Sequence, residues 1–210
     1  MHVWAVVVAA GRGERFGAPK QYEALGGRRV LDWALDAAGA RAEGVVLVVP
    51  PERVAEPEPG ATVVVAGAAT RSGSVRAGLA SVPPSAEVVL VHDAARPLAP
   101  PAVFDAVLDA VAAGADGAVP GLPVSDTVKR VAPDGTVLET LDRSALVTVQ
   151  TPQAFRAGAL RAAHAGGDDA SDDAALVEAA GGRVVVVPGA AAGAKVTAPG
   201  DLPALEAELR

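Results

Sequence analysis

The sequence predicts an α/β fold in which a parallel sheet is covered by helices on both faces. Apolar runs recur at residues 3–9, 45–49, 62–66 and 88–91, and each is continuous rather than alternating. Strands buried on both faces have this pattern, which is typical of parallel sheets. Helical patterns separate the runs, and this alternation favours an α/β sandwich.

The first helix is expected at residues 30–40, where Val30, Trp33, Ala34 and Ala37 lie near one face. Further helices are predicted at residues 71–82, 101–113, 156–165, 171–180 and from about residue 201, with another strand at 184–187. Pro101 suits the first turn of its helix, because that position needs no backbone N–H donor.

Residues 124–149 interrupt this alternation. Two alternating stretches flank a Pro-Asp-Gly turn at residues 133–135, which is a β-hairpin signal. Hairpins inserted in α/β domains often project as arms. The sequence therefore predicts one domain over residues 1–210 with an arm at about 124–149.

Composition narrows the class of protein. The chain has no cysteine, which excludes disulfides, thiolate metal sites and cysteine nucleophiles. Its net charge of −7 argues against a nucleic-acid-binding surface. The apolar run at residues 3–10 is too short for a membrane span and lacks the positive leader of a signal peptide. We therefore expect a soluble, cytoplasmic protein with neither nucleic acid nor membrane as a partner.

The first predicted strand ends in a basic, glycine-rich loop, AVVVAAGRGERFGAPK at residues 5–20. Ligands of open parallel sheets bind beyond the carboxyl ends of strands, and glycine-rich turns let backbone N–H groups approach phosphate. The dinucleotide fingerprint does not fit, because its third glycine comes one place late, at Gly17; the P-loop, which needs Gly-Lys before Ser or Thr, does not fit either. An ordinary tight turn is the alternative, but Arg15 and Lys20 favour phosphate binding.

The fourth predicted strand ends at His92 and Asp93. A carboxylate at a strand end suits Mg²⁺, which takes one or two carboxylates together with phosphate oxygens. Arg96 adds a guanidinium that can grip phosphate. The alternative for Asp93 is a helix cap. His92 is expected to be packed or hydrogen-bonded, because no G-x-S-x-G motif accompanies it.

Other polar residues have simpler interpretations. Ser72 or Ser74 can cap the helix at 71–82, whose N-terminus is a further anion or base-edge site. Lys195 lies beside an apolar run and is otherwise a solvated surface lysine. Acidic residues gather at helix N-termini, so no metal site is expected at the cluster formed by Asp168, Asp169, Asp172 and Asp173.

Together these stretches resemble the 2-C-methyl-D-erythritol 4-phosphate cytidylyltransferases of the non-mevalonate isoprenoid pathway. The resemblance is carried, in family order, by AAGRGERFGAPKQ, TRSGSVRAGL, VHDAARP, DTVKR, QTPQAF, DDAALVE and KVTAPGDL. It implies a Rossmann-like nucleotidyltransferase sandwich whose hairpin arm reaches into a partner subunit of a homodimer. It also implies the reaction: CTP and the polyol phosphate give a CDP-alcohol and pyrophosphate, with Mg²⁺.

The resemblance assigns roles residue by residue. Catalytic roles fall on Arg15, Lys20 and Lys195. Nucleotide binding falls on Ala9, Ala10, Gly11, Gly13, Gly67, Arg71 and Ser74. Binding of the polyol phosphate falls on Asp93, Arg96, Thr127, Arg143 and Thr151, with Asp93 also associated with the metal.

Some positions depart from the family pattern. Ala68 and Ala69 stand where a glycine and an aspartate are common. If backbone groups read the cytosine, this change matters little; if the aspartate side chain reads it, base preference is altered. A tryptophan common after the arm arginine is replaced near Val147, and Gly193 or Ala194 stands where asparagine is frequent.

Three rival functions remain open from the sequence. Ribitol-5-phosphate cytidylyltransferases share most of these motifs, and the acceptor can be another polyol or sugar phosphate. A non-catalytic nucleotide-binding protein is the second rival, but the set of Arg15, Lys20 and Asp93 speaks against it, because binding alone needs no metal carboxylate. The third is a nicotinamide dehydrogenase, which the off-register glycines disfavour.

Overall fold

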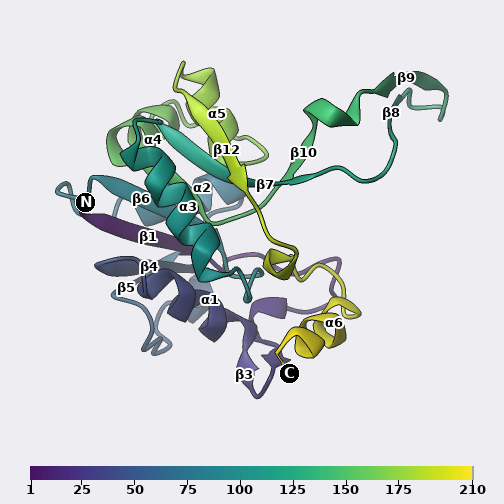
Figure 1. The fold of residues 1–210 in the computed structure, drawn as a ribbon. Helices are drawn as coiled ribbons and strands as arrows, with labels where there is room; N and C mark the ends of the chain where they lie inside the picture. The colour runs from purple at the N-terminus through teal and green to yellow at the C-terminus, as the bar shows by residue number, and fades with distance from the viewer. Residues whose placement is uncertain (210) are drawn as a thin grey trace.

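The structure is a computed structural model that describes residues 1–209. Its centre is an eight-stranded sheet with the order β10-β7-β11-β6-β1-β4-β5, in which β12 also pairs with β7 (Figure 1). The strands are β1 (Val3–Val8), β4 (Gly44–Val49), β5 (Val63–Ala66), β6 (Val88–Asp93), β7 (Gly117–Pro123), β10 (Val147–Val149), β11 (Gln153–Arg156) and β12 (Val184–Pro188). Two short strands, β2 (Ala24–Leu25) and β3 (Arg28–Arg29), form a separate ribbon.

The predicted parallel arrangement holds for most of the sheet, because β1, β4, β5, β6, β7 and β12 all run in the same direction. β1 pairs in parallel with β4 and β6, and β4 pairs in parallel with β5. However, β11 is antiparallel to both β6 and β7, and β10 is antiparallel to β7. The sheet is therefore mixed but mainly parallel; the predicted α/β sandwich is confirmed, and only β10 and β11 depart from the predicted parallel direction.

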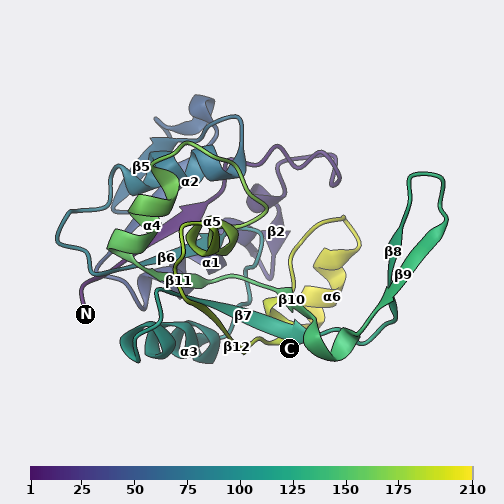
Figure 2. The same cartoon turned by 90° about the horizontal axis from the view of Figure 1, so that it is seen from above.

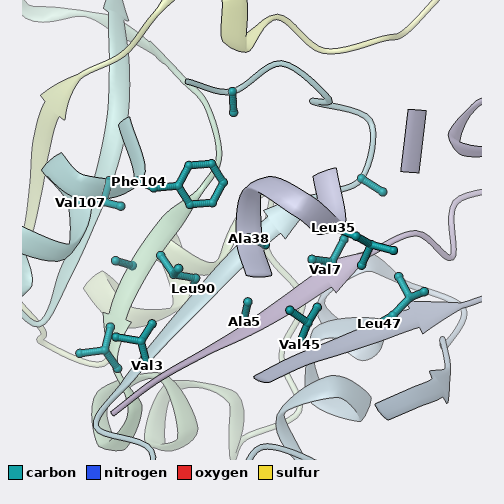
Figure 3. Close-up of a cluster of buried hydrophobic side chains, with 14 of the residues drawn as sticks. Val3, Ala5, Val7, Leu35, Ala38, Val45, Leu47, Leu90, Phe104 and Val107 are labelled. Atoms are coloured by element: carbon teal, nitrogen blue, oxygen red, sulfur yellow. The ribbon is translucent and has the colours of Figure 1, made fainter. Parts of the chain in front are cut away.

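Helices cover both faces of the sheet (Figures 1 and 2). The helices are α1 (Val30–Gly39), α2 (Arg71–Leu79), α3 (Pro101–Ala112), α4 (Ala157–His164), α5 (Asp173–Ala179) and α6 (Asp201–Glu208). All but α6 pack on the main sheet, whereas Leu205 of α6 packs with Leu25 and Val30 in a separate cluster. Side chains of α1 and α3 pack with Ala5 and Val7 in one core cluster (Figure 3), whereas side chains of α2, α4 and α5 pack with Val6 in another. Successive residues of β1 thus face opposite cores, which is why the run is continuously apolar.

Two inner strands were not predicted from the sequence. β7 contains Pro120, Pro123 and two glycines, residues that are normally depleted in strands. The glycines allow close packing, since a Cβ built at Gly117 would lie 2.6 Å from a ring carbon of Phe155, and one at Gly121 would lie 2.7 Å from Val186. β11 has only four residues.

The predicted hairpin is confirmed. β8 (Val128–Val131) and β9 (Val137–Leu141) form a separate antiparallel ribbon, which projects away from the body of the molecule (Figures 1 and 2). At its turn, Gly135 has a φ of +87°, and the N–H of Thr136 donates to Asp134 Oδ1 at 2.9 Å. Within residues 1–209, no helix has the length and apolar character needed to span a membrane.

Candidate active site

A cavity of about 620 Å³ lies beyond the carboxyl ends of the neighbouring strands β1 and β6. Its walls come from the loop after β1, the residues before α2, the end of β6 and Lys195. Of the predicted site residues, the structure brings these to the cavity wall: Ala9, Ala10, Gly11, Gly13, Arg15, Lys20, Arg71, Ser74, Asp93 and Lys195. Strand-end reasoning from the sequence thus located the cavity.

The loop after β1 is held in shape by two features. Gly13 has a φ of +67°, and a Cβ there would lie 1.8 Å from the carbonyl oxygen of Ala18, so only glycine fits. The buried amide of Gln21 donates from Nε2 to the carbonyl oxygens of Ala9 at 2.7 Å and Gly11 at 3.0 Å. Sequence reasoning missed Gln21, because a lone glutamine gives no chemical signal.

Cations crowd this cavity. Lys20 lies in a short 3₁₀ turn, Lys20–Tyr22, that follows the loop. Its pKa is lowered by burial, and the charges of Lys195 and Arg15 lower it further. A bound anion would relieve this repulsion, so the cavity is suited to phosphate groups.

Asp93 lies at the centre of the charged groups. Its Oδ2 accepts a 2.6 Å hydrogen bond from Lys195 Nζ, and Arg71 Nε lies 3.4 Å from Oδ1. Burial alone would raise the pKa of this carboxyl, but Lys195 and Arg71 outweigh it and hold the pKa well below its usual range. The capping alternative for Asp93 is wrong, because α3 begins after Pro100.

Behind Asp93, the buried His92 organises the end of the strand. Its Nε2 lies 3.2 Å from the carbonyl oxygen of Arg96, which can only accept, so Nε2 carries the proton. Its Nδ1 then accepts from the hydroxyl of Thr151 at 3.1 Å, and that hydroxyl in turn accepts the N–H of Asp93 at 3.0 Å. Burial lowers the pKa of His92 to about 4. The prediction of a hydrogen-bonded histidine is confirmed.

The N-terminus of α2 is capped differently from the prediction. Thr70, rather than Ser72 or Ser74, accepts the N–H of Gly73 through its Oγ1 at 3.0 Å. Ser74 instead accepts the N–H of Ala68 at 3.0 Å and donates to the carbonyl oxygen of Thr70 at 2.9 Å. Ser74 therefore shapes the backbone of the loop that lines the cavity.

At Gly67, the loop after β1 packs against the residues that lead into α2; both segments were predicted to bind the nucleotide. A Cβ at Gly67 would lie 2.3 Å from the Cβ of Ala10 and 3.1 Å from Ser74 Oγ, so only glycine allows this approach. Ala68 and Ala69 follow it and line the cavity with methyl groups and backbone.

The remaining predicted residues lie outside the cavity wall of this chain. The Arg96 guanidinium donates to the carbonyl oxygen of Gly193 at 2.7 Å, and Thr151 is buried against His92. Thr127 and Arg143 belong to the projecting arm, where Arg143 donates to the carbonyl oxygen of Ser125. Roles for these four residues in substrate binding stay predictions.

The mixed sheet between two layers of helices is a nucleotidyltransferase-type fold, and a basic cavity around one carboxylate lies at its strand ends. The family model IspD, 2-C-methyl-D-erythritol 4-phosphate cytidylyltransferase, matches residues 3–210, and the chain belongs to this family of cytidylyltransferase enzymes.

Individual relatives agree with this assignment. A 2-C-methyl-D-erythritol 4-phosphate cytidylyltransferase of Frankia casuarinae is 47% identical over 99% of this chain and 81% of its own length. One from Streptomyces coelicolor is 48% identical over 98% and 84%. The crystal structure of the enzyme from Thermus thermophilus superposes with a TM-score of 0.84 at 40% identity, covering 99% of this chain and 98% of that one.

Some relatives are longer. A bifunctional enzyme IspD/IspF of Clavibacter michiganensis is 51% identical over 76% of this chain, which spans 42% of that protein's length. The similarity thus concerns one part of that bifunctional relative.

Proposed function

We propose that this protein transfers the cytidylyl group of CTP to 2-C-methyl-D-erythritol 4-phosphate and releases pyrophosphate, the reaction for which its family is named. One observation carries the proposal. Lys20, Lys195 and Arg71 surround the Asp93 carboxylate in a cavity at the ends of β1 and β6. This is where a nucleotide triphosphate would meet a phosphate acceptor in an α/β sheet.

The chemistry needs charge neutralisation more than proton transfer. An oxygen of the acceptor phosphate forms the new bond to the α-phosphorus of CTP, and the bond to the β-phosphate oxygen breaks, so that pyrophosphate leaves with the electron pair. The second pKa of a phosphate monoester is about 6, so this oxygen is already anionic at neutral pH and requires no general base. The site has to bring two anions together in line.

The residues of the cavity wall divide these tasks. We assign Lys20 and Arg15 to the triphosphate and to the negative charge of the transition state, and Lys195 to the reacting phosphates. The loops joined at Gly67 and Ala10 would hold the cytidine, with Ser74 fixing the backbone that faces the base.

Mg²⁺ is a further part of the proposal. Among residues 1–209, no group of three or more acidic or histidine side chains is placed to hold a metal ion. The ionised Asp93 lines the cavity and fits the usual mode in which one carboxylate and substrate phosphate oxygens bind Mg²⁺. When bound, the ion would neutralise phosphate charge and help to align the reactants.

We also propose a cytoplasmic homodimer with composite active sites. Val131, Val137 and Leu138 of the arm are more than half exposed, at 54%, 55% and 59%. An isolated hairpin is marginally stable, so packing against a second subunit would stabilise it. Thr127 and Arg143 would then reach the partner's cavity.

The test is an assay of pyrophosphate release with Mg²⁺, each of the four NTPs, and a panel of polyol phosphates that includes ribitol 5-phosphate. We expect turnover with CTP and 2-C-methyl-D-erythritol 4-phosphate. Preference for ribitol 5-phosphate would mean that the natural acceptor is ribitol 5-phosphate. Equal use of UTP and CTP would mean that base selection is relaxed, as the alanines at 68 and 69 allow. Absence of turnover with CTP and every acceptor would contradict the proposal.

A further inference from the structure

A buried carboxylate outside the cavity wall contacts one of the cavity's cations. Asp173, the first residue of α5, has a side-chain exposure of 0% and is not part of the cavity wall. Its Oδ2 accepts a hydrogen bond from Arg71 Nη1 at 2.7 Å, and its Oδ1 accepts one from His164 Nε2 at 3.0 Å. His164, at the end of α4, is also buried. The mechanism above makes no use of Asp173 or His164.

Helix capping does not explain Asp173. The cap of α5 is the neighbouring Asp172, whose Oδ1 accepts the N–H of Ala175 at 3.0 Å. The general preference of acidic residues for helix N-termini therefore accounts for Asp172. Both oxygens of Asp173 instead contact side chains of other helices.

Arg71 links this buried pair to the active site. Its guanidinium lies between two carboxylates: the contact with Asp173 is 2.7 Å long, whereas the contact with Asp93 is 3.4 Å. These contacts use Nη1 and Nε, and Nη2 makes no hydrogen bond to any residue of 1–209. The shorter contact holds the guanidinium of Arg71, a residue that also lines the cavity.

We propose that Asp173, itself held by His164, is a positioning residue that fixes the Arg71 guanidinium for binding the phosphates of the nucleotide. A buried carboxylate without partners is costly, so Asp173 retains both Arg71 and His164. A guanidinium that is already oriented loses less conformational freedom when an anion binds. Without Asp173, Arg71 is left with Asp93 as its carboxylate partner and competes there with Lys195.

This inference rests on the proposed function, so wild-type affinity for CTP is measured first, by calorimetry with Mg²⁺ and without acceptor. In Asp173→Asn the amide cannot accept from both Arg71 and His164. We expect the Kd and the KM for CTP each to rise about tenfold, which corresponds to the loss of one charge-assisted hydrogen bond. We expect kcat to change by less than about threefold, because Lys20 and Lys195 are untouched. Asp168→Asn is the matched control, since it makes the same charge change on an exposed residue nearby.

A second pair of variants keeps the test decisive if Asp173→Asn does not fold. The side-chain amide of His164→Gln can donate to Asp173 much as Nε2 does, whereas His164→Leu cannot. We expect His164→Leu to raise the KM for CTP and His164→Gln to restore most of the wild-type value. A general packing defect would not distinguish the two in this way.

The outcomes separate the two proposals. If the wild-type protein does not bind CTP, the proposed function fails and this inference falls with it. If the wild type binds CTP, and Asp173→Asn and His164→Leu bind it equally well, the positioning role is wrong. A lower melting temperature with unchanged affinity for CTP would show that Asp173 serves stability alone, and would also overturn the inference.

Discussion

At the scale of single residues, the candidate active-site cavity has several positive charges around one carboxylate. Burial and the neighbouring cations Lys195 and Arg15 lower the pKa of Lys20. Asp93 compensates part of this charge through its contact with Lys195. The remaining cations repel one another in the free site, and a bound anion would reduce this repulsion.

Replacement of Lys20 with alanine should reduce turnover far more than binding. We place Lys20 where charge develops on the α-phosphate, and loss of one such preorganised donor typically costs about a hundredfold or more in kcat. We expect the Kd for CTP to change less, because Arg15, Arg71 and the loop backbone remain. Steady-state kinetics and calorimetry check this. A kcat within a factor of a few of wild type would exclude the role.

Asp93→Asn tests the carboxylate charge separately from its shape. The amide has nearly the same size but lacks the charge that Lys195 and Arg71 face. We expect loss of both activity and the response to Mg²⁺, measured as pyrophosphate release across a Mg²⁺ titration. Thermal unfolding serves as the control for folding. Full Mg²⁺-dependent activity in this variant would contradict a role for the charge.

His92 should make the protein less stable in acid. Burial lowers the pKa of His92 to about 4 in the folded chain, whereas an unfolded histidine has a pKa of about 6.5. The unfolded chain therefore takes up a proton first as the pH falls. The stability that His92 contributes is complete above about pH 6.5 and is lost as the pH falls towards about 4, by on the order of 3 kcal/mol.

Urea unfolding of the wild type and of His92→Leu at pH 7, 5.5 and 4.5 measures this effect. The variant lacks the hydrogen bonds to Thr151 and Arg96, so it should be less stable at pH 7. Its stability should nevertheless fall less steeply with pH than that of the wild type. Equal slopes would assign the acid sensitivity to other groups.

At the scale of elements, α2 lies unusually close to the sheet. A Cβ built on Gly78 would lie 2.5 Å from Val6 of β1 and 3.0 Å from Val48 of β4. Arg71 is the first residue of α2 and lines the cavity, so this close packing of α2 also fixes the position of Arg71 at the cavity wall. Gly78 is therefore needed for the close packing of α2 on the sheet, not for a turn of the chain.

Two glycine substitutions test this packing against helix propensity. Gly78→Ala should destabilise the protein by about 1–3 kcal/mol, because overpacking outweighs the better helix propensity of alanine. Gly158→Ala in α4 is the matched control: apart from its chain neighbours and the backbone of its own helix, no atom lies within 4 Å of its Cβ position, so the variant should gain about 0.5–1 kcal/mol. Denaturant unfolding measures both. A stabilising Gly78→Ala would mean that the contact with Val6 relaxes easily.

Whether a strand could be predicted depended on the residue pattern within the strand itself. β1, β4 and β6 could be predicted, because residues facing two cores must all be apolar. β7 could not, because its prolines and glycines oppose the strand preference, and only contacts with distant residues such as Phe155 explain them. The antiparallel direction of β11 depends on the path of the arm, which local sequence does not encode.

The same reasoning separates the parts of the site. Arg15, Lys20 and Asp93 follow directly from where predicted strands end. The link between Arg71 and Asp173 could not be predicted in this way, because it joins residues 102 positions apart. Charged residues at strand ends can be recognised in the sequence, but the buried side chains that hold them in place cannot.

At the scale of the whole molecule, the arm is the part that the body of this chain does not cover (Figures 1 and 2). β8 and β9 pair with each other and not with the main sheet. Apolar side chains of β8 and β9 are exposed, and the polar residues predicted to bind the acceptor, Thr127 and Arg143, lie beside them. A second copy of the chain would bury these apolar side chains, and its bound substrate would lie within reach of Thr127 and Arg143.

We therefore predict a two-fold dimer in which Lys20 and Asp93 of one subunit act with Thr127 and Arg143 of the other. Lys20→Ala and Arg143→Ala should each be nearly inactive as homodimers. In a mixed dimer both defects fall in one site and the other site is wild type. Random mixing of equal amounts should restore about a quarter of wild-type activity, because half of the dimers are mixed and each has one intact site of two.

Mass spectrometry of tagged protomers must first show that subunits exchange. The control is a mixture of Lys20→Ala with Asp93→Asn, because both residues line the cavity of the same subunit. A mixed dimer of that pair has one defect in each site, so it should restore no activity. If exchange occurs and the mixture of Lys20→Ala with Arg143→Ala also stays inactive, both residues serve the same subunit's site, and the composite model is wrong.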